Sequence, residues 1–145
     1  MDNLLLIVTL AGSRVAMRAC DVDSVVEIES LTAAPRTAPH IAGLAALRSR
    51  VLTVVDCRAA LEPGTFSQRR TGDAVMALVE GHPYALLVDS VEDVVEAQSP
   101  VKPVCTTLSG GWGRVSAGMV EAEGDLLLLV DVASLIAGPA AAAAA

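Results

Sequence analysis

Aromatic side chains are almost absent from this chain. Of its 145 residues, only Phe66, Tyr84 and Trp112 are aromatic, whereas 25 are Ala, 20 are Val and 18 are Leu. A hydrophobic core must therefore be built from small aliphatic side chains, and the high valine content favours β-strands. At about 100–200 residues per domain, the length allows one compact unit, or two small halves that share one core.

Basic residues are also scarce, with 10 Lys and Arg against 17 Asp and Glu. This balance excludes nucleic acid as an expected partner, because phosphate binding needs a basic face and base stacking needs aromatic rings. The charge is uneven: residues 1–72 carry 8 Arg and 7 acids, whereas residues 73–145 carry 2 basic residues and 10 acids. The asymmetry indicates two surfaces with different partners, or acids that simply keep the second half soluble.

Long hydrophobic runs and paired cysteines are missing as well. The longest apolar runs, 74–79 and 140–145, are far shorter than the roughly 20 residues of a membrane-spanning helix. The N-terminus has no basic region and does not resemble a secretory signal, so we expect a cytoplasmic protein. Cys20, Cys57 and Cys105 form no Cys-x-x-Cys pair. We therefore expect free, mostly buried thiols, no metal and no cofactor.

Short runs rich in Val and Leu, separated by turn residues, predict strands rather than long helices. The glycine-rich stretch 109–113 is expected to be a flexible loop, with Trp112 as a local plug or a contact residue. The six alanines that end the chain are too few to form a stable helix, so we expect a frayed tail. The predicted strands include 4–10, 14–19, 24–29, 41–47 and 51–56, and short helices are expected at 56–61 and 132–137.

The two halves of the chain resemble each other. Residues 8–28 align with residues 77–97 at a shift of 69, with six identities, and residues 43–61 align with 118–136 at a shift of 75, with four. Each half would contain two strands around a glycine turn, a Val-x-x-Val-Val-Glu strand, and two strands ending in Val-Asp before a short helix. Such modules of about 65 residues would gain stability by packing together. Chance alignment of valine-rich strands is the alternative.

No catalytic motif with a recognisable spacing is present. Cys57 with His40 could form a thiolate pair, but Cys57 equally fits a small core residue. Asp56 and Asp131 each precede a predicted helix, where capping of backbone amides is favoured over a paired-carboxylate site. We expect no enzyme, with a small Cys-dependent enzyme or a ligand-binding barrel as the alternative.

The stretch 41–61, IAGLAALRSRVLTVVDCRAAL, resembles the signature of CheW-like chemotaxis coupling proteins, in which Gly-x-x-x-Leu-Arg-Gly leads into a strand ending Val-Asp-Leu-Arg. Residues 25–28 and 87–94 resemble two further family strands, and Gly118 with residues 126–135 resembles the last strand and helix. The chain departs from the pattern at Ser49, where the family has Gly, and at Cys57, where it has Leu. If the family glycine has a positive φ, Ser49 is strained or the turn differs.

The resemblance implies a mainly β fold: two five-stranded SH3-like β-barrel subdomains packed around a shared hydrophobic core, with one or two short helices. It implies one domain over residues 1–138, with subdomain 1 at about 10–72 and subdomain 2 at about 73–131 plus the terminal segments. Residues 139–145 would be a flexible tail.

The same resemblance implies a non-catalytic adaptor, recruited to membrane-associated chemoreceptor arrays. Its partners would be a CheA-type histidine kinase, the cytoplasmic tip of a methyl-accepting chemoreceptor and other CheW-like domains in the array. A pilus-motility or other chemosensory pathway that uses the same fold is the alternative.

The resemblance further implies a set of docking residues. The Arg48 guanidinium suits a bidentate contact with a partner carboxylate or carbonyl, and an internal salt bridge to Glu27 is the alternative. Apolar strand residues would line a groove for a receptor helical hairpin, unless they are plain core, because only alternate strand residues face outward. The expected interface consists of Arg48, Val25, Glu27, Ile28, Val88, Val91 and Gly118.

Overall fold

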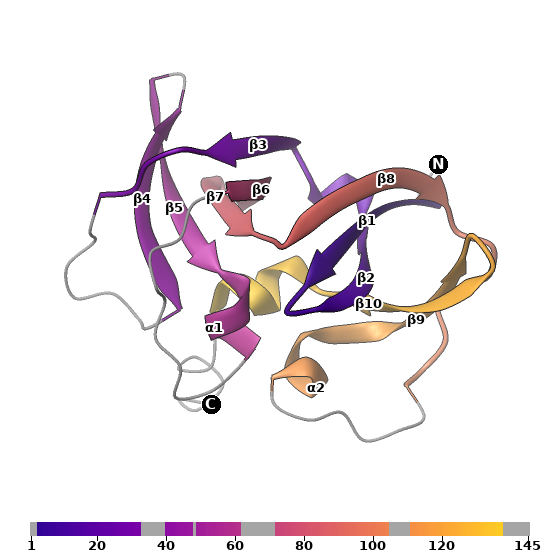
Figure 1. The fold of residues 1–145 in the computed structure, drawn as a ribbon. Coiled ribbons are helices and arrows are strands. Elements are labelled where there is room, and N and C mark those ends of the chain that lie inside the picture. Colours follow the sequence, from indigo (N-terminus) through magenta and orange to yellow (C-terminus); the bar gives the residue numbers. More distant parts are fainter. Residues whose placement is uncertain (1–2, 33–39, 48, 62–71, 105–110, 138–145) are drawn as a thin grey trace.

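The computed structural model describes residues 3–32, 40–47, 49–61, 72–104 and 111–137. Its ten strands form two five-stranded sheets, each curled into a barrel, and the barrels lie side by side (Figure 1). Barrel A contains β1 (Leu4–Leu10), β2 (Ser13–Arg18), β8 (Ser90–Glu96), β9 (Ser116–Ala122) and β10 (Asp125–Val130). Barrel B contains β3 (Ser24–Ile28), β4 (Ile41–Leu47), β5 (Arg50–Asp56), β6 (Gly72–Val79) and β7 (His82–Leu87). The mainly β, two-barrel fold predicted above is confirmed.

Each barrel combines strands from both halves of the sequence. The strand orders are β8-β1-β2-β10-β9 and β3-β6-β7-β5-β4. Each strand of one half has an equivalent in the other half, β1 with β6, β2 with β7, and so on to β5 with β10. When each strand is replaced by its equivalent, one strand order becomes the other. A hairpin from one half is thus completed by three strands from the other half. The predicted subdomains at about 10–72 and 73–131 do not correspond to these barrels, because the chain crosses between them after β2 and again after β7.

The strand registers confirm the internal duplication. In barrel A, Val8 pairs with Val15, and in barrel B, Ala77 pairs with Tyr84, so both partners move by 69. The parallel pair Leu129↔Ala16 corresponds to Val54↔Ala85, at shifts of 75 and 69. These are the two shifts that the sequence alignment gives. The similarity between the halves is therefore structural and not a chance match of valines.

Two equivalent glycines allow each barrel to close. Gly43 has a φ of 151°, and a Cβ there would lie 2.6 Å from the carbonyl oxygen of Thr32. Gly118 has a φ of 130°, and a Cβ there would lie 2.7 Å from the carbonyl oxygen of Lys102. Both glycines adjoin a β-bulge and a bridge, Thr32↔Leu44 or Lys102↔Met119. Only glycine fits such a close backbone approach at this φ.

Three hydrophobic clusters stabilise the molecule. Barrel B encloses one cluster that includes Leu52, Val54 and Leu87, and barrel A encloses an equivalent one that includes Leu127 and Leu129. The third and largest lies between the barrels and draws buried residues from both, so the predicted shared core is present. Burial of apolar area at about 25 cal/mol per Å² makes this the surface that holds the two barrels together.

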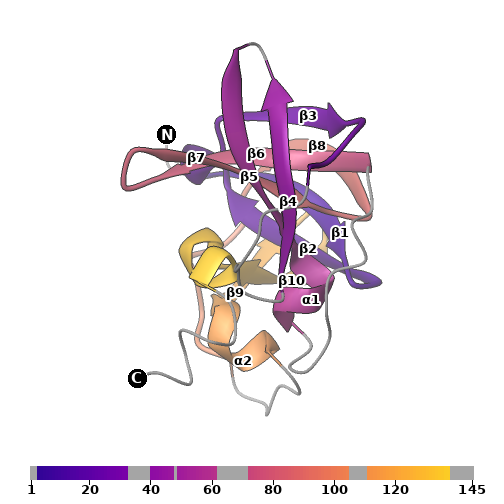
Figure 2. The ribbon, with the colours of Figure 1, turned by 90° about the vertical axis from the view of Figure 1, so that its left-hand side faces the viewer.

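Two equivalent short helices pack at the junction of the barrels (Figures 1 and 2). They are α1 (Cys57–Leu61) and the helix of residues 132–137, which is related to α1 by the shift of 75. Asp56 caps α1, because its Oδ1 accepts hydrogen bonds from the amides of Arg58 and Ala59 at 3.1 and 3.4 Å. Asp131 occupies the equivalent position, but its Oδ2 accepts a bond from the Ser134 hydroxyl at 2.7 Å. Amide capping is thus confirmed at Asp56, and Asp131 binds a side chain instead.

A third helix lies where a flexible loop was predicted. It is α2 (Trp112–Val115), and the amide of Gly111 before it donates to the carbonyl of Leu61 at 2.6 Å. Trp112 is half-buried against the shared core, in agreement with a local plug. The loop prediction is wrong because packing against α1, and not local propensity, orders this segment.

The predicted continuous strand over residues 87–94 is interrupted. The amide of Val88 donates to the carbonyl of Asp73 in barrel B at 3.1 Å, and the next amide, of Asp89, donates to Thr9 in barrel A at 2.8 Å. The chain therefore changes barrels at these two residues.

Some predictions concern residues outside the described part of the chain. They are Arg48, Cys105 and the alanine tail. Among the described helices, none is long and apolar enough to cross a membrane.

Candidate docking faces

The outer side of β3 forms the first candidate docking face. Val25 and Glu27 are both exposed, and 47% of the Val25 surface is accessible. Residues two apart on a strand point to the same side. β3 is an edge strand that pairs only with β6 within the described sheet, so this side carries an apolar group next to a carboxylate at the rim of barrel B. We call Val25 and Glu27 the β3 face.

An equivalent face lies on β8 of barrel A, and the sequence analysis did not include it among the site residues. Val94 is 49% exposed and Glu96 is exposed, and they lie 69 residues after Val25 and Glu27. The strand pairs Leu6↔Val94 and Val25↔Val75 are equivalent under the same shift. The repeat alignment matches these residues, so it was the signal that could have identified Val94 and Glu96. We call them the β8 face.

Four of the predicted interface residues do not lie on an exposed face. Ile28 and Val88 are only 3% and 5% exposed and belong to hydrophobic cores. Val91 is half-buried against the shared core, and Gly118 is buried at the close backbone approach described above. These four residues therefore pack within the protein, and a direct contact with a partner stays a prediction for them. The sequence could not separate the two roles because both give valine-rich strands.

Arg48 lies outside the described residues, and Ser49 and Arg50 after it are described. Ser49 has a φ of 67°, in the left-handed region, and its equivalent in barrel A is Gly124, with a φ of 81°. Ser49 therefore adopts the positive φ that the expectation of strain required, so the turn keeps the glycine conformation and does not differ. Arg50 next to it is exposed.

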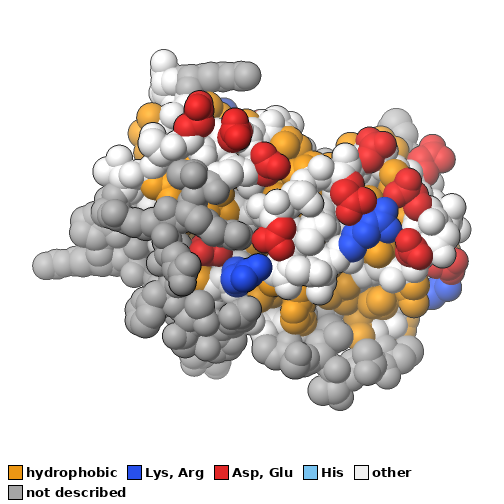
Figure 3. Space-filling model, in the orientation of Figure 1, with side chains coloured by type: hydrophobic (Ala, Val, Ile, Leu, Met, Phe, Trp, Pro, Cys, Tyr) orange, Lys and Arg blue, Asp and Glu red, His pale blue; other side chains and the backbone are white. Residues whose placement is uncertain are grey.

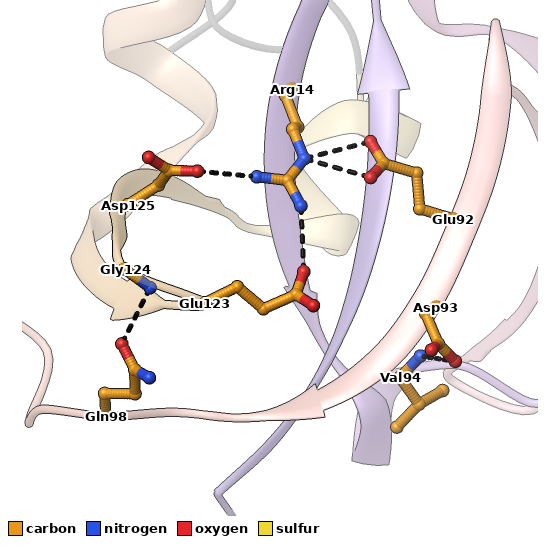
Figure 4. Close-up of polar contacts among 8 residues, drawn as sticks. All are labelled: Arg14, Glu92, Asp93, Val94, Gln98, Glu123, Gly124 and Asp125. Carbon is orange, nitrogen blue, oxygen red and sulfur yellow. Dashed lines mark hydrogen bonds and ion pairs between the residues drawn. The ribbon is translucent and has the colours of Figure 1, made fainter.

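One end of barrel A is closed by an ion cluster centred on Arg14 of β2 (Figure 4). Its guanidinium contacts Glu92 at 3.0 Å, Glu123 at 2.9 Å and Asp125 at 3.0 Å. The hydrogen bond to Glu92, with further support from Glu123, raises the pKa of Arg14. Three carboxylates around one cation leave a net negative charge. Acidic side chains gather around a basic one over this barrel in Figure 3.

The equivalent end of barrel B is open. In barrel B, Pro83 stands at the position of Arg14 and Asp23 at that of Glu92, both at a shift of 69. Arg50 stands at the position of Asp125, at a shift of 75. Proline cannot reach a carboxylate, so nothing equivalent to the Arg14 guanidinium fills the space. A hollow of about 140 Å³ lies here. It is lined by Asp23, Ser24, Val25, Val26, Leu47, Arg50 and Met76. Val25 of the β3 face is therefore part of a pocket of mixed polar and apolar lining, which carries one charge of each sign.

Arg114 of α2 connects the helices at the barrel junction. Its Nη2 donates to the carbonyl of Ala60 in α1 at 2.7 Å, and its Nη1 donates to the carbonyl of Ser134. Burial lowers the pKa of Arg114. A cation that binds the last carbonyls of two helices stabilises both helix ends.

The candidate catalytic pair is engaged in packing. Cys57 is fully buried, and His40 Nε2 lies 2.8 Å from the carbonyl oxygen of Ile136. This distance fits a ring in which Nε2 donates to that carbonyl, so that the ring anchors the C-terminal helix to barrel B. In the described part of the chain, no cluster of three His, Cys, Asp or Glu side chains could hold a metal ion.

The fold and its exposed groups therefore define a double-barrel β protein with two related candidate docking faces. The family profile described as a CheW-like domain matches residues 4–140. The chain belongs to the CheW-like family.

Relatives agree with this assignment in sequence and in fold. The chemotaxis protein CheW of Thermotoga maritima is 26% identical over 121 residues, which cover 81% of this chain and 79% of that protein. The crystal structure of the scaffolding protein TtCheW from Thermoanaerobacter tengcongensis superimposes with a TM-score of 0.75 at 20% identity, over 91% of this chain and 90% of that one. The structural likeness extends over both barrels.

Proposed function

We propose that this chain is a non-catalytic adaptor of chemotaxis signalling, which couples chemoreceptors to a CheA-type histidine kinase in the cytoplasm. The observation that carries the proposal, beside family membership, is the pair of equivalent docking faces on two barrels. One chain with two related faces can hold two different partners at a fixed separation, because the shared core makes the barrels one packed unit.

The two faces suit different partners because their surroundings differ. The β3 face adjoins an open pocket and Arg50, whereas the β8 face adjoins the acidic Arg14 cluster. Charge at the rim of an interface selects partners and orients them. We propose that the β3 face, with Arg48 nearby in the sequence, contacts one partner and that the β8 face contacts the other.

Matched substitutions on the two faces test this assignment. Val25→Lys and Val94→Lys each place a charge at an exposed position, so the fold should be retained in both variants. Binding to a CheA-type kinase and to a receptor cytoplasmic fragment is measured by isothermal titration calorimetry. Each variant should lose affinity for one partner by tenfold or more, a difference of about 1.4 kcal/mol, while it keeps the other. No binding of the unmodified chain to either partner at tens of micromolar would contradict the adaptor proposal.

Arg48→Glu is a second test of the same surface. Reversal of charge should abolish coupling of receptor state to kinase activity while the thermal unfolding midpoint changes little. Loss of the fold in this variant would assign Arg48 a structural role instead.

A further inference from the structure

We propose that the open pocket of barrel B binds a small aliphatic amino acid in its zwitterionic form, with the ammonium group at Asp23 and the carboxylate at Arg50. The inference goes beyond the adaptor role, because it concerns a free small molecule and not a protein partner. Its test needs only the purified chain, so it can fail while the adaptor proposal holds.

Two side chains of opposite charge line this pocket. Asp23 lies just before β3, and Arg50 begins β5. Within the described part of the chain, neither side chain has an ion pair or a hydrogen bond. A carboxylate and a guanidinium that line one hollow without pairing to each other can bind the two ends of a zwitterion, because each attracts a group of opposite charge.

Barrel A shows which group the barrel B pocket lacks. There the Arg14 guanidinium bridges two carboxylates, with Nε 3.0 Å from Glu92 and Nη1 3.0 Å from Asp125 (Figure 4). Asp23 stands at the position of Glu92. Arg50 stands at that of Asp125, and a proline replaces the bridging arginine. A ligand that fills the same space in barrel B must therefore present a cation to Asp23 and an anion to Arg50.

The pocket also leaves apolar side chains uncovered. Met76 is 7% exposed and Leu47 is half-buried, whereas the equivalent residues of barrel A, Ile7 and Ala122, are completely buried. The hollow of about 140 Å³ is close to the size of an apolar cavity of roughly 150 Å³ that binds benzene. A branched aliphatic side chain therefore fits against Leu47 and Met76, and burial of its apolar surface adds to the two charge contacts.

Ser24 provides a further polar group in the pocket lining. Its hydroxyl donates to the Met76 sulfur, with Oγ 3.5 Å from Sδ. A thioether sulfur is a weak acceptor, so the hydroxyl can turn to the carboxylate of a ligand at little cost. The pocket thus offers the carboxylate two donors, from Arg50 and Ser24, and offers the ammonium group one acceptor, Asp23.

Titration of the isotope-labelled chain with L-valine, followed by amide chemical shifts in NMR spectra, measures the binding. At neutral pH and low salt, the amides of Ser24, Val26 and Arg50 should shift together and saturate with a Kd of about 10 mM or lower. Salt at about 1 M should weaken binding, because it screens both charge contacts. Absence of saturable shifts at these amides up to about 50 mM L-valine overturns the inference.

Analogues of valine that each lack one group separate the three contributions. Isobutylamine keeps the ammonium group, isovalerate keeps the carboxylate, and glycine keeps both but has no aliphatic side chain. Each should bind at least about fivefold more weakly than L-valine, because each loses one of the three contacts. Isobutylamine or isovalerate that binds as well as L-valine would refute recognition of both charges, and glycine that does so would refute the aliphatic contact.

Substitution of the two charged residues locates the site. Asp23→Asn and Arg50→Gln should each weaken L-valine binding about fivefold or more. The same charge changes outside the pocket lining, Asp93→Asn and Arg58→Gln, are the matched controls and should leave binding unchanged. Dispersed amide spectra confirm that each variant is folded. Equal effects of the pocket variants and their controls would exclude this site.

Pro83→Arg tests the comparison with barrel A directly. It places an arginine at the position of Arg14, where its guanidinium can pair with Asp23 and occupy the space of the ammonium group. L-valine binding should therefore fall about tenfold or more. A folded Pro83→Arg variant that binds L-valine as the unmodified chain does would contradict the proposed position of the ligand.

Discussion

The two barrels share their strand order, the bulge beside each closing glycine and the closing glycines themselves, yet they differ at their exposed ends. In barrel A, Arg14 gathers three carboxylates and closes the end. In barrel B, Pro83 stands at the position of Arg14, Arg50 stands at that of Asp125, and a pocket remains. The glycines at the close backbone approaches have stayed alike, whereas the charged positions at the barrel ends have diverged.

This difference explains how a duplicated fold can serve two roles. The interior must satisfy close packing in both barrels, so a change there is costly. Surface substitutions usually change stability by about 0.5 kcal/mol or less, which leaves charge and shape at the ends free to differ. The shared core then holds the β3 and β8 faces, whose surroundings differ in charge, in one fixed arrangement.

Substitution of the closing glycines, Gly43 and Gly118, should have the largest effect and tests whether the two barrels close in the same way. Gly43→Ala and Gly118→Ala should each lower the free energy of unfolding by about 3 kcal/mol, because each adds steric overlap with a carbonyl oxygen to an unfavourable φ. Urea denaturation measures the loss. Gly12→Ala is the matched control, since Gly12 has a φ of +83° but nothing within 4 Å of its Cβ position, and it should cost about 1 kcal/mol. If Gly43 or Gly118 behaves like Gly12, the close approach does not matter energetically.

The next comparison concerns the two hydrogen bonds by which Arg114 joins α1 to the helix of residues 132–137. Arg114→Met removes two hydrogen bonds to helix carbonyls and should lower the free energy of unfolding by about 2 kcal/mol. Arg58→Met on α1 is the control, because Arg58 is half exposed and lies 3.8 Å from Asp89, so its removal should cost less than about 0.5 kcal/mol. Thermal unfolding of both variants checks the difference. Equal losses would show that these hydrogen bonds add nothing beyond a surface charge.

Periodicity and turn residues predicted five strands with explicit bounds, and all five boundary pairs are within one residue of those observed. The repeat alignment also matched residues that turn out to hold equivalent register positions, such as Val25 with Val94 and Ala16 with Ala85. It could not show the exchange of strands between barrels. Local sequence determines where a strand begins and ends, whereas the choice of partner strand depends on packing across the whole molecule.

The docking residues were harder to predict than the fold. Val25 and Ile28 lie on one short strand, yet one is exposed and the other is in the barrel core. A valine-rich strand on a small barrel has too few polar residues to mark its outer side. Likewise, the pocket beside Arg50 is lined by residues from four strands and the segment before β3, and such a grouping depends on the tertiary fold, which the sequence pattern does not show.

Ser49 and Gly124 give the smallest and most direct comparison, because they occupy equivalent turns at φ values of 67° and 81°. Ser49→Gly should raise the free energy of unfolding by about 1 kcal/mol, since glycine adopts this φ without the steric cost of a Cβ. Gly124→Ser should lower it by a similar amount, so the double variant should match the unmodified chain, as distant sites usually add. Ser13→Gly, in strand β2, is the control and should destabilise, because there glycine only adds entropy to the unfolded chain. A neutral Ser49→Gly would mean that the barrel B turn relaxes around serine, and that the two hairpin tips differ in backbone shape as well as in charge.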